Sequence, residues 1–226
     1  MDKDAYLTKL AKSYMAIMGD GRTGVFCEDS LAEPGGWSLK TQQCVELGTF
    51  DVVVTNPPFG SKIKVTGERK LSQYDLAKRW KRDRSDDDWE SEAAVRTDQS
   101  PQILFIERCI QLLKPGGRLG IILPESIFGM TNYGYVVSHL LKKYTLRGFV
   151  SLPEEVFQPY THAKTCVVFL QNDPPPGDES YEMAIADWFG HDSRGNVTVR
   201  RSADGSEEIL DDIPKIAESL HGRIRW

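Results

Sequence analysis

An apolar stretch that ends in two prolines constrains this chain more than any other feature. Residues 50–55 (FDVVVT) have the length and β-branched composition of a buried strand, and residues 56–59 (NPPF) follow at once. Proline has no backbone N–H and cannot continue a sheet ladder, and Pro58 holds Pro57 in an extended conformation. The sequence therefore predicts a buried strand that stops in a rigid turn with its carbonyl groups pointing outward.

This turn combines groups that suit a planar amine. The Asn56 side-chain oxygen and the Pro57 carbonyl are hydrogen-bond acceptors, and Phe59 adds a flat apolar face. An adenine amino group is a weak nucleophile because its lone pair is delocalised into the ring. Two neutral acceptors on its N–H bonds let the nitrogen pyramidalise and attack an electrophilic methyl group. We interpret Asn56, Pro57, Pro58 and Phe59 as a candidate catalytic turn, with an ordinary Asn-Pro-Pro turn as the alternative.

Helix and strand patterns alternate along residues 1–171. This alternation predicts an α/β fold with a doubly wound, mostly parallel sheet. A breaker-rich linker opens a C-terminal extension over residues 172–226. Hydrophobic spacing predicts helices over residues 5–18, 101–113, 133–143 and 213–220, and strands over residues 24–27, 50–55, 118–123, 146–152, 165–170 and 181–186.

Residues 60–98 are polar and weakly periodic, so we expect a mobile loop beside the site with at most a short helix near residues 71–80. Nine Lys and Arg residues lie between positions 62 and 84 against three acids, and such a basic arm is able to grip nucleic-acid phosphates. Because acids follow at residues 86–92, a solvated and self-neutralising loop is an equal alternative. The predicted nucleic-acid contacts are Phe59, Lys62, Lys64, Arg69 and Lys70.

Composition narrows the class of protein only a little. The net charge of −5 does not indicate nucleic-acid binding. The four cysteines are far apart and have no metal-ligand spacing, so no metal site is predicted, and Cys27, Cys109 and Cys166 are expected in the core. No apolar run approaches the roughly 20 residues that span a bilayer, and no signal peptide opens the chain. We therefore expect a cytoplasmic protein without a membrane partner.

Five stretches together resemble one family. In order, they are similar to modification subunits of type I restriction systems, which are adenine-N6 DNA methyltransferases. The resemblance covers about residues 1–171 and implies a Rossmann-like methyltransferase sheet, S-adenosylmethionine as methyl donor, and site-specific methylation of DNA. It also implies a specificity subunit and a restriction subunit as partners. The stretches are residues 7–21, 28–31, 50–60, 113–118 and 151–157.

By this resemblance, Asp2 binds the cofactor's ribose, Asp29 and Ser30 bind its adenine, and Asn56 touches both cofactor and substrate. The alternatives are a frayed terminus for Asp2 and a simple turn cap at Asp29-Ser30. The glycine-rich turn that follows the first strand in such enzymes has no counterpart before residue 50. The resemblance thus implies an N-terminally incomplete sheet, with either an exposed edge that pairs with another chain, giving a homo-oligomer, or a displaced N-terminal segment.

Two further hypotheses remain at the level of sequence. Relatives that methylate a protein glutamine amide or an RNA base also carry Asn-Pro-Pro, usually with tyrosine in the fourth position, so Phe59 favours DNA only modestly. The isolated chain is alternatively a non-catalytic fragment or assembly module, inactive because part of its cofactor site is missing.

Overall fold

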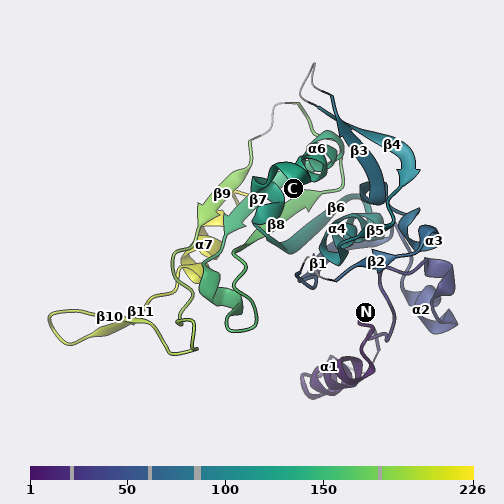
Figure 1. The fold of residues 1–226 in the computed structure, drawn as a ribbon. Coiled ribbons are helices and arrows are strands. Elements are labelled where there is room, and N and C mark those ends of the chain that lie inside the picture. Colours follow the sequence, from purple (N-terminus) through teal and green to yellow (C-terminus); the bar gives the residue numbers. More distant parts are fainter. Residues whose placement is uncertain (21–22, 61–62, 84–87, 178–179) are drawn as a thin grey trace.

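The computed structural model describes residues 1–20, 23–60, 63–83, 88–177 and 180–226. Within them, a five-stranded sheet in the order β1-β6-β8-β7-β9 forms the centre of the molecule (Figure 1). This arrangement confirms the predicted α/β class. Along the chain the strands are β1 (Phe50–Thr55), β6 (Leu113–Pro124), β7 (Thr145–Ser151), β8 (Thr165–Gln171) and β9 (Glu182–Ile185).

The sheet is mixed but mostly parallel, as predicted, because β8 alone runs against the other four strands. β1 runs parallel to β6 and β9 runs parallel to β7, but β8 is antiparallel to both of its neighbours. The connection from β7 to β8 holds only the short 3₁₀ turn Glu154–Phe157. A parallel return needs a long crossover, usually a helix, so the short connection brings β8 back in the opposite direction.

Helices cover both faces of the sheet. α4 (Pro101–Leu112) and α6 (Gly134–Lys143) lie on one face, and α7 (Ile213–Leu220) packs on the other beside β7 and β9 (Figure 1). The main core fills the space under α4 and α6, where Ile103 and Ile121 are fully buried. This core is formed by the apolar residues that recur every three to four positions in the helices and by those of the strands, as the sequence predicts.

The remaining elements are short or lie outside these layers. No helix among the described residues is long and apolar enough to cross a membrane. These elements are the helices α1 (Ala5–Ile17), α2 (Leu39–Cys44), α3 (Glu68–Leu71) and α5 (Ser126–Gly129), and the paired strands β2 (Val65–Thr66) with β5 (Asp98–Gln99), β3 (Lys78–Arg82) with β4 (Trp89–Val95), and β10 (Val199–Arg201) with β11 (Glu207–Ile209).

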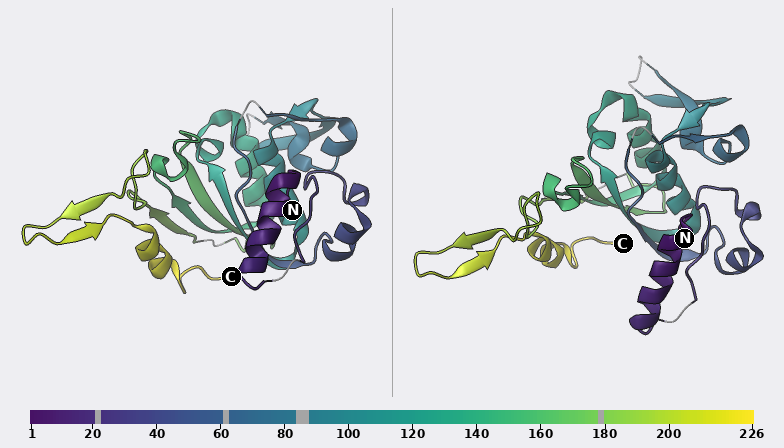
Figure 2. Two further views of the ribbon diagram at one scale, coloured as in Figure 1. Left: turned by 90° about the horizontal axis from the view of Figure 1, so that it is seen from below. Right: turned by 60° about the horizontal axis from the view of Figure 1, so that its bottom comes forward.

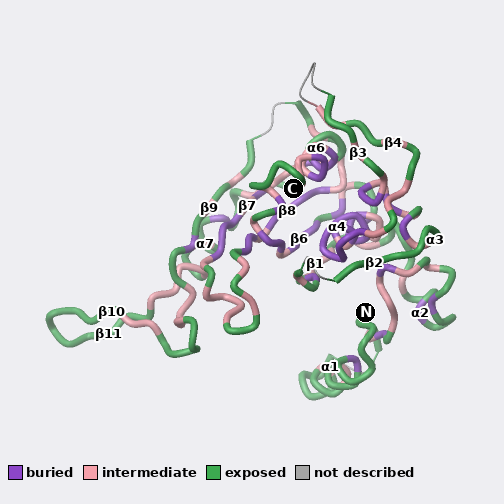
Figure 3. Tube along the Cα trace, viewed as in Figure 1, coloured by how far each residue is buried: buried purple, intermediate pink, exposed green. Residues whose placement is uncertain are grey.

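β1 is an edge strand, not the buried strand that its composition predicts. Among the described strands it pairs with β6 alone, with Thr55 opposite Ile121. Val53 packs toward the core under α4, but Val52 and Val54 on the other face are 45% and 79% exposed. β1 is drawn in the colours of intermediate and exposed residues in Figure 3. Apolar composition shows what a strand prefers to contact, and a free edge with exposed valines is a surface suited to a further strand.

The N-terminal helix forms where predicted but buries little. Asp4 caps α1 by accepting hydrogen bonds from backbone N–H groups of its first turn. The apolar stripe of Leu7, Leu10, Tyr14 and Ile17 is exposed, and α1 stands apart from the helices that cover the sheet (Figure 1). The periodicity therefore gave the helix correctly, while its apolar face lacks a described partner.

The predicted strand over residues 24–27 reduces to a single isolated bridge. Cys27 lies opposite Asp2 in this parallel bridge, and no named strand forms on either side. Cys27 is exposed, which corrects its expected place in the core, whereas Cys109 and Cys166 are buried as predicted.

The segment over residues 60–98 is more ordered in its described part than the sequence suggests. It contains α3 and the pairs β2–β5 and β3–β4, so the expectation of at most a short helix is wrong. Leu71, Tyr74 and Leu76 are fully buried, and Trp80 and Trp89 pack near Tyr135 of α6. These apolar residues occur singly between charged residues, so their spacing does not show the regular period from which a helix or strand is predicted. The mobility of the segment stays a prediction.

The C-terminal extension contributes to the central sheet. β9 pairs with β7, and α7 spans the residues predicted for the last helix. The β10–β11 hairpin projects away from the sheet (Figure 2). The linker at residue 172 therefore does not separate two independently packed bodies.

Candidate functional site

The Asn56 turn lies at the carboxyl end of β1, as predicted. Asn56 is exposed and Pro57 is buried, and no described residue hydrogen-bonds to the Asn56 side chain. The backbone N–H of Gly60 donates to Oε1 of Gln102 over 3.3 Å, and the Gln102 side chain belongs to the first turn of α4. α4 therefore holds the turn in place through Gln102, while the Asn56 side-chain amide is exposed.

Phe59 meets a second aromatic ring from a distant part of the chain. Its ring packs edge to face against Phe157, with centroids 5.4 Å apart and planes at 78°. Phe157 ends the 3₁₀ turn between β7 and β8, and both rings are half-buried. The two rings form an apolar wall beside Asn56 against which a planar base is able to stack.

A polar cluster closes the same edge of the sheet. Glu125 follows β6, Ser151 ends β7 and Lys164 precedes β8. The Ser151 hydroxyl hydrogen-bonds to the Glu125 carboxylate, whose other oxygen lies 3.5 Å from Nζ of Lys164. Ligands of open α/β sheets bind at the carboxyl ends of the parallel strands, and this cluster lies at that edge.

The proposed cofactor residues form a second group. The backbone N–H of Asp2 donates to Phe26 and the N–H of Glu28 donates to Asp2, which draws Asp2 beside the Asp29 loop. The Asp2 carboxylate accepts the N–H of Asp4 and is exposed, so its side chain remains accessible. Ser30 is half-buried next to them.

Asp29 already has a cationic partner. Its Oδ2 accepts from Nζ of Lys70 over 2.7 Å, and its Oδ1 accepts the N–H of Leu31 over 3.0 Å. Burial raises the pKa of the Asp29 carboxyl, but the hydrogen bonds from Lys70 and Leu31 outweigh burial and hold the pKa below its ordinary value. Asp29 is thus ionised, and an amine that approaches it meets Lys70 at one oxygen.

One helix holds both groups in place. Near the start of α4, Gln102 contacts the Asn56 turn, and Arg108 on the same helix donates to the carbonyl of Ala32, just past Asp29. These two positions are six residues apart, about 9 Å along a helix. Within the described part of the chain no contact joins the two groups directly, so α4 sets their separation. Arg108 is 1% exposed and lies over the Tyr74 ring at 5.1 Å.

Three of the five predicted nucleic-acid contacts are engaged in intramolecular ion pairs. Lys64 pairs with Asp98, Arg69 with Glu33 and Lys70 with Asp29. Lys62 lies outside the described residues. Exposed pairs of this kind contribute about 0–1 kcal/mol each, so they exchange readily for phosphate. None of these three carboxylate partners belongs to the acids at residues 86–92, so the pairing does not decide between the basic arm and the self-neutralising loop.

Sequence reasoning missed Gln102, Phe157, Glu125 and Lys164 as site residues. Phe157 lies in a stretch that the resemblance covers, but nothing local shows that it reaches Phe59 across about 100 positions. Gln102 looks like a helix-start residue, and only its burial at 4% marks it as more than that. Pairs that meet through the sheet leave no signal in local spacing.

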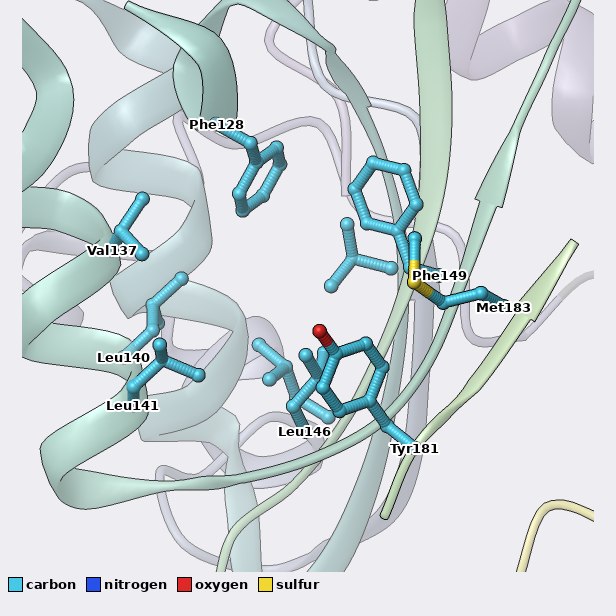
Figure 4. Close-up of a pocket in the computed structure, with 10 residues that line it drawn as sticks. Phe128, Val137, Leu140, Leu141, Leu146, Phe149, Tyr181 and Met183 are labelled. Carbon is cyan, nitrogen blue, oxygen red and sulfur yellow. The ribbon is translucent and has the colours of Figure 1, made fainter. Parts of the chain in front are cut away.

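The apolar cavity in Figure 4 does not serve this site. It has a volume of about 260 Å³ and lies between α6 and the sheet, lined by residues such as Phe128, Phe149 and Met183. The only side-chain hydroxyl in its lining belongs to Tyr181. Such a lining offers neither acceptors for an amine nor partners for a charged cofactor.

The layered sheet, with its polar turn at the carboxyl end of β1, has the fold of S-adenosylmethionine-dependent methyltransferases. A protein described as a class I enzyme of this kind from Listeria monocytogenes superposes with a TM-score of 0.59 at 18% identity, over 99% of this chain and 54% of that one. Residues 1–189 match the N-6 DNA Methylase family, and the chain belongs to that family.

Two curated relatives are similar over parts of their length. The type I restriction enzyme EcoEI methylase subunit of Escherichia coli is 30% identical over 126 residues, which cover 55% of this chain and 21% of that protein. A protein described as a type II restriction enzyme and methyltransferase, RM.MjaORFECS2P of Methanocaldococcus jannaschii, is 26% identical over 147 residues, or 65% of this chain and 11% of that protein. This chain therefore matches only 21% and 11% of the lengths of these two relatives.

Proposed function

We propose that this chain carries the catalytic turn of a site-specific DNA methyltransferase, which transfers a methyl group from S-adenosylmethionine to N6 of adenine as the modification subunit of a restriction system. The observation that carries the proposal is the exposed Asn56 amide at the carboxyl end of β1, which no described residue hydrogen-bonds, beside the rings of Phe59 and Phe157. The family match supports the reaction class. Because its proposed substrate is DNA, the protein acts in the cytoplasm in this proposal.

The target adenine must leave the duplex to reach this turn, since its amino group is inaccessible in the base stack. Phe59 then stacks on the extruded base, with Phe157 closing the wall. The Asn56 side-chain oxygen and the Pro57 carbonyl each accept one N–H bond of the amine. The donor's methyl–sulfur bond would break as the nitrogen–carbon bond forms, with its electron pair left on sulfur. These two oxygens would stabilise the positive charge that develops on the nitrogen, and the extra proton would then leave to water.

The residues present fit the proposed cofactor in part. The bound cofactor supplies an electrophilic methyl group on a sulfonium sulfur. Asp2 has an accessible carboxylate for ribose hydroxyls, and Asp29 has acceptor capacity left for an adenine amine, because a carboxylate accepts up to about four hydrogen bonds. Ser30 lies between them in the chain. Asn56 faces both the cofactor and the base in this proposal.

DNA binding in the proposal uses the basic arm. Lys64, Arg69 and Lys70 release their exposed carboxylate partners and contact phosphates, with Lys62 as a fourth contact. Sequence recognition comes from a separate specificity subunit, and a restriction subunit completes the system. A second copy of the chain is a further proposed partner, through the free edge of β1 and its exposed Val52 and Val54.

Substitution of Asn56 tests the proposed function. Asn56→Ala in the complete subunit removes one of the two acceptors, and we expect methyl transfer to N6 of adenine to fall by at least about 100-fold, with cofactor affinity changed only modestly. Transfer of labelled methyl groups to DNA and calorimetry with S-adenosylmethionine measure the two quantities. The matched control is Asn132→Ala, on the exposed turn before α6. Retained turnover by Asn56→Ala would refute the role of Asn56.

A further inference from the structure

A polar cavity of about 430 Å³ lies between the tail that follows α7 and the starts of β7 and β9. Three guanidinium groups line it, from Arg147, Arg223 and Arg225, together with Ser180 and one carboxylate, that of Glu182. The described lining therefore carries a formal charge of +2. Such a concentration of arginine in one concave site is unusual on a chain whose net charge is −5.

The tail presents its arginines because alternate residues anchor it. Gly222 follows the last turn of α7 with a φ of +80°, a left-handed conformation that reverses the chain. Ile224 then packs into the apolar layer under α7, and Trp226 lies edge-on to Phe169. Arg223 and Arg225 alternate with these anchors, and both are exposed. The apolar residues thus fix the tail while the intervening arginines face the cavity.

Arg147 approaches from the opposite wall. It lies in the irregularity of β7 between Leu146 and Gly148, and its Nε donates to Oε1 of Gln171 over 2.9 Å. Its two terminal nitrogens have no hydrogen-bond partner among the described residues. A guanidinium held at Nε with its outer nitrogens free presents a fixed fork, the geometry that binds phosphate oxygens in pairs.

The acids among the described residues leave most of this charge uncompensated. Among the described residues, the only ion pair in the cavity joins Arg223 to Glu182 at 4.0 Å, the limit of an ion pair, and Arg225 has none. The carbonyl of Leu220 near the end of α7 accepts the N–H groups of Arg223 and Ile224, which reduces the negative end of the helix dipole beside the cavity. The cavity is therefore suited to an anion of charge about −2.

The cavity is separate from the Asn56 turn. Arg147 lies near the start of β7, whereas Asn56 follows the end of β1, three strands away in the sheet. Strand spacing and rise place the two positions roughly 20 Å apart. A ligand here does not take part in methyl transfer, and the inference below does not depend on the proposed function.

We propose that this cavity binds a phosphate group, carried either by a nucleic-acid backbone or by a free nucleoside polyphosphate. The guanidinium groups of Arg147 and Arg225, together with the positive charge of the cavity, match a dianionic phosphate better than a single carboxylate. The Ser180 hydroxyl adds a hydrogen-bond donor. The volume accommodates a phosphate with at least one further group attached.

The test removes the two tail arginines, whose side chains are exposed. Arg223→Gln/Arg225→Gln is compared with Arg194→Gln/Arg200→Gln, which removes equal charge from exposed positions on the projecting hairpin region. Calorimetry of the full chain with pyrophosphate and ATP forms one arm, and fluorescence anisotropy with a labelled 20-base-pair duplex forms the other. We expect the cavity variant to bind at least about tenfold more weakly in one arm, and the control variant to match the unmodified chain.

The two arms separate the sources of phosphate. Loss of pyrophosphate and ATP binding identifies a free polyphosphate, and loss of duplex affinity with a shallower salt dependence identifies a nucleic-acid backbone. Loss in both arms supports the phosphate site for either source. Failure of all three probes to bind the unmodified chain, or equal binding by the cavity and control variants, overturns the proposal. Neither readout involves methyl transfer, so these results stand apart from those of Asn56→Ala.

Discussion

Nζ of Lys70 lies 2.7 Å from Oδ2 of Asp29, so the carboxylate proposed to receive the cofactor's adenine is bound to a residue proposed to contact DNA. The pair is partly exposed, with 32% and 39% of the two side chains accessible. A lysine that moves away to contact a phosphate no longer donates to Asp29. Release of Lys70 toward DNA would therefore leave Asp29 with a free acceptor, and this links the two proposed sites.

Removal of Lys70 should strengthen cofactor binding. Lys70→Met keeps the aliphatic stem and frees Oδ2 of Asp29, and we expect S-adenosylmethionine to bind about 3- to 10-fold more tightly because a charged acceptor is regained. Arg69→Met, which breaks the neighbouring pair with Glu33, is the control. Calorimetry decides the matter, and unchanged or weaker binding by Lys70→Met would contradict competition at Asp29.

Loss of Phe157 should weaken the hold on the extruded base. Phe157→Ala deletes the edge-to-face partner of Phe59, a pair worth about 0.5–1.5 kcal/mol beyond buried area. We expect the KM for DNA to rise about 3- to 10-fold in the complete subunit, with cofactor affinity unchanged. Phe157→Leu, which keeps apolar bulk, should recover part of the loss. A KM identical to that of the unmodified enzyme would exclude Phe157 from the wall.

Arg108 should stabilise the fold through the loop that carries Asp29. The buried guanidinium donates to the Tyr74 hydroxyl, the Ala32 carbonyl and Gln73. Arg108→Met leaves these acceptors unpaired, and we expect unfolding free energy to fall by about 2–4 kcal/mol in denaturant titrations. The control is Arg79→Met at an exposed position, expected within about 0.5 kcal/mol of the unmodified chain. Equal midpoints for both variants would contradict this role.

Stability should fall in mildly acidic solution because of His139. Burial lowers the pKa of His139 to about 4, and Lys143 acts in the same direction. The unfolded chain titrates near the ordinary value of about 6.5, so it binds more protons than the folded chain between these values. This contribution is complete above pH ~6.5 and is lost as the pH falls toward 4, by up to about 3 kcal/mol.

Denaturant titrations between pH 4 and 7 measure the His139 effect. His139→Phe keeps a ring among Trp80 and Tyr144 and should flatten the pH dependence in this window, whereas the exposed His162→Phe should not. Hydrogen bonds from Lys143 and Lys78 hold the pKa of Asp75 at about 2, so Asp75 changes the stability of the fold in a lower pH range than His139 does. Its effect is lost only as the pH falls below the ordinary value of about 3.9, which keeps the two groups distinguishable.

The free edge of β1 should promote self-association. Val54 is 79% exposed, and Val54→Lys places a charge on this edge strand. We expect an oligomer by size exclusion with light scattering, and a shift toward monomer in Val54→Lys. Val197→Lys, at a 63% exposed valine near the hairpin, should leave the mass unchanged. A monomeric unmodified chain with protected β1 amides would count against the second copy as a partner.

The local sequence pattern was sufficient to predict those helices and strands whose own residues carry the hydrophobic spacing. Helical spacing and a proline stop gave α4, and alternate or continuous apolar runs gave β6, β7 and β8 to within a few residues at most ends. Local pattern was insufficient where burial depends on a neighbour. The same apolar content made β6 a central strand and left β1 at an edge, because hydrophobicity specifies a preference for contact and not which strand supplies it.

The sequence by itself determined the chemistry of the Asn56 turn, since donorless prolines and an amide side chain have fixed hydrogen-bonding roles wherever they are placed. Tertiary structure alone decided that Phe157 faces Phe59, that Lys70 occupies Asp29, and that three arginines share a cavity. Each of these contacts joins residues from separate elements. Their proximity arises from strand order and helix packing, which depend on the free energy of the whole fold and are not encoded in any single segment.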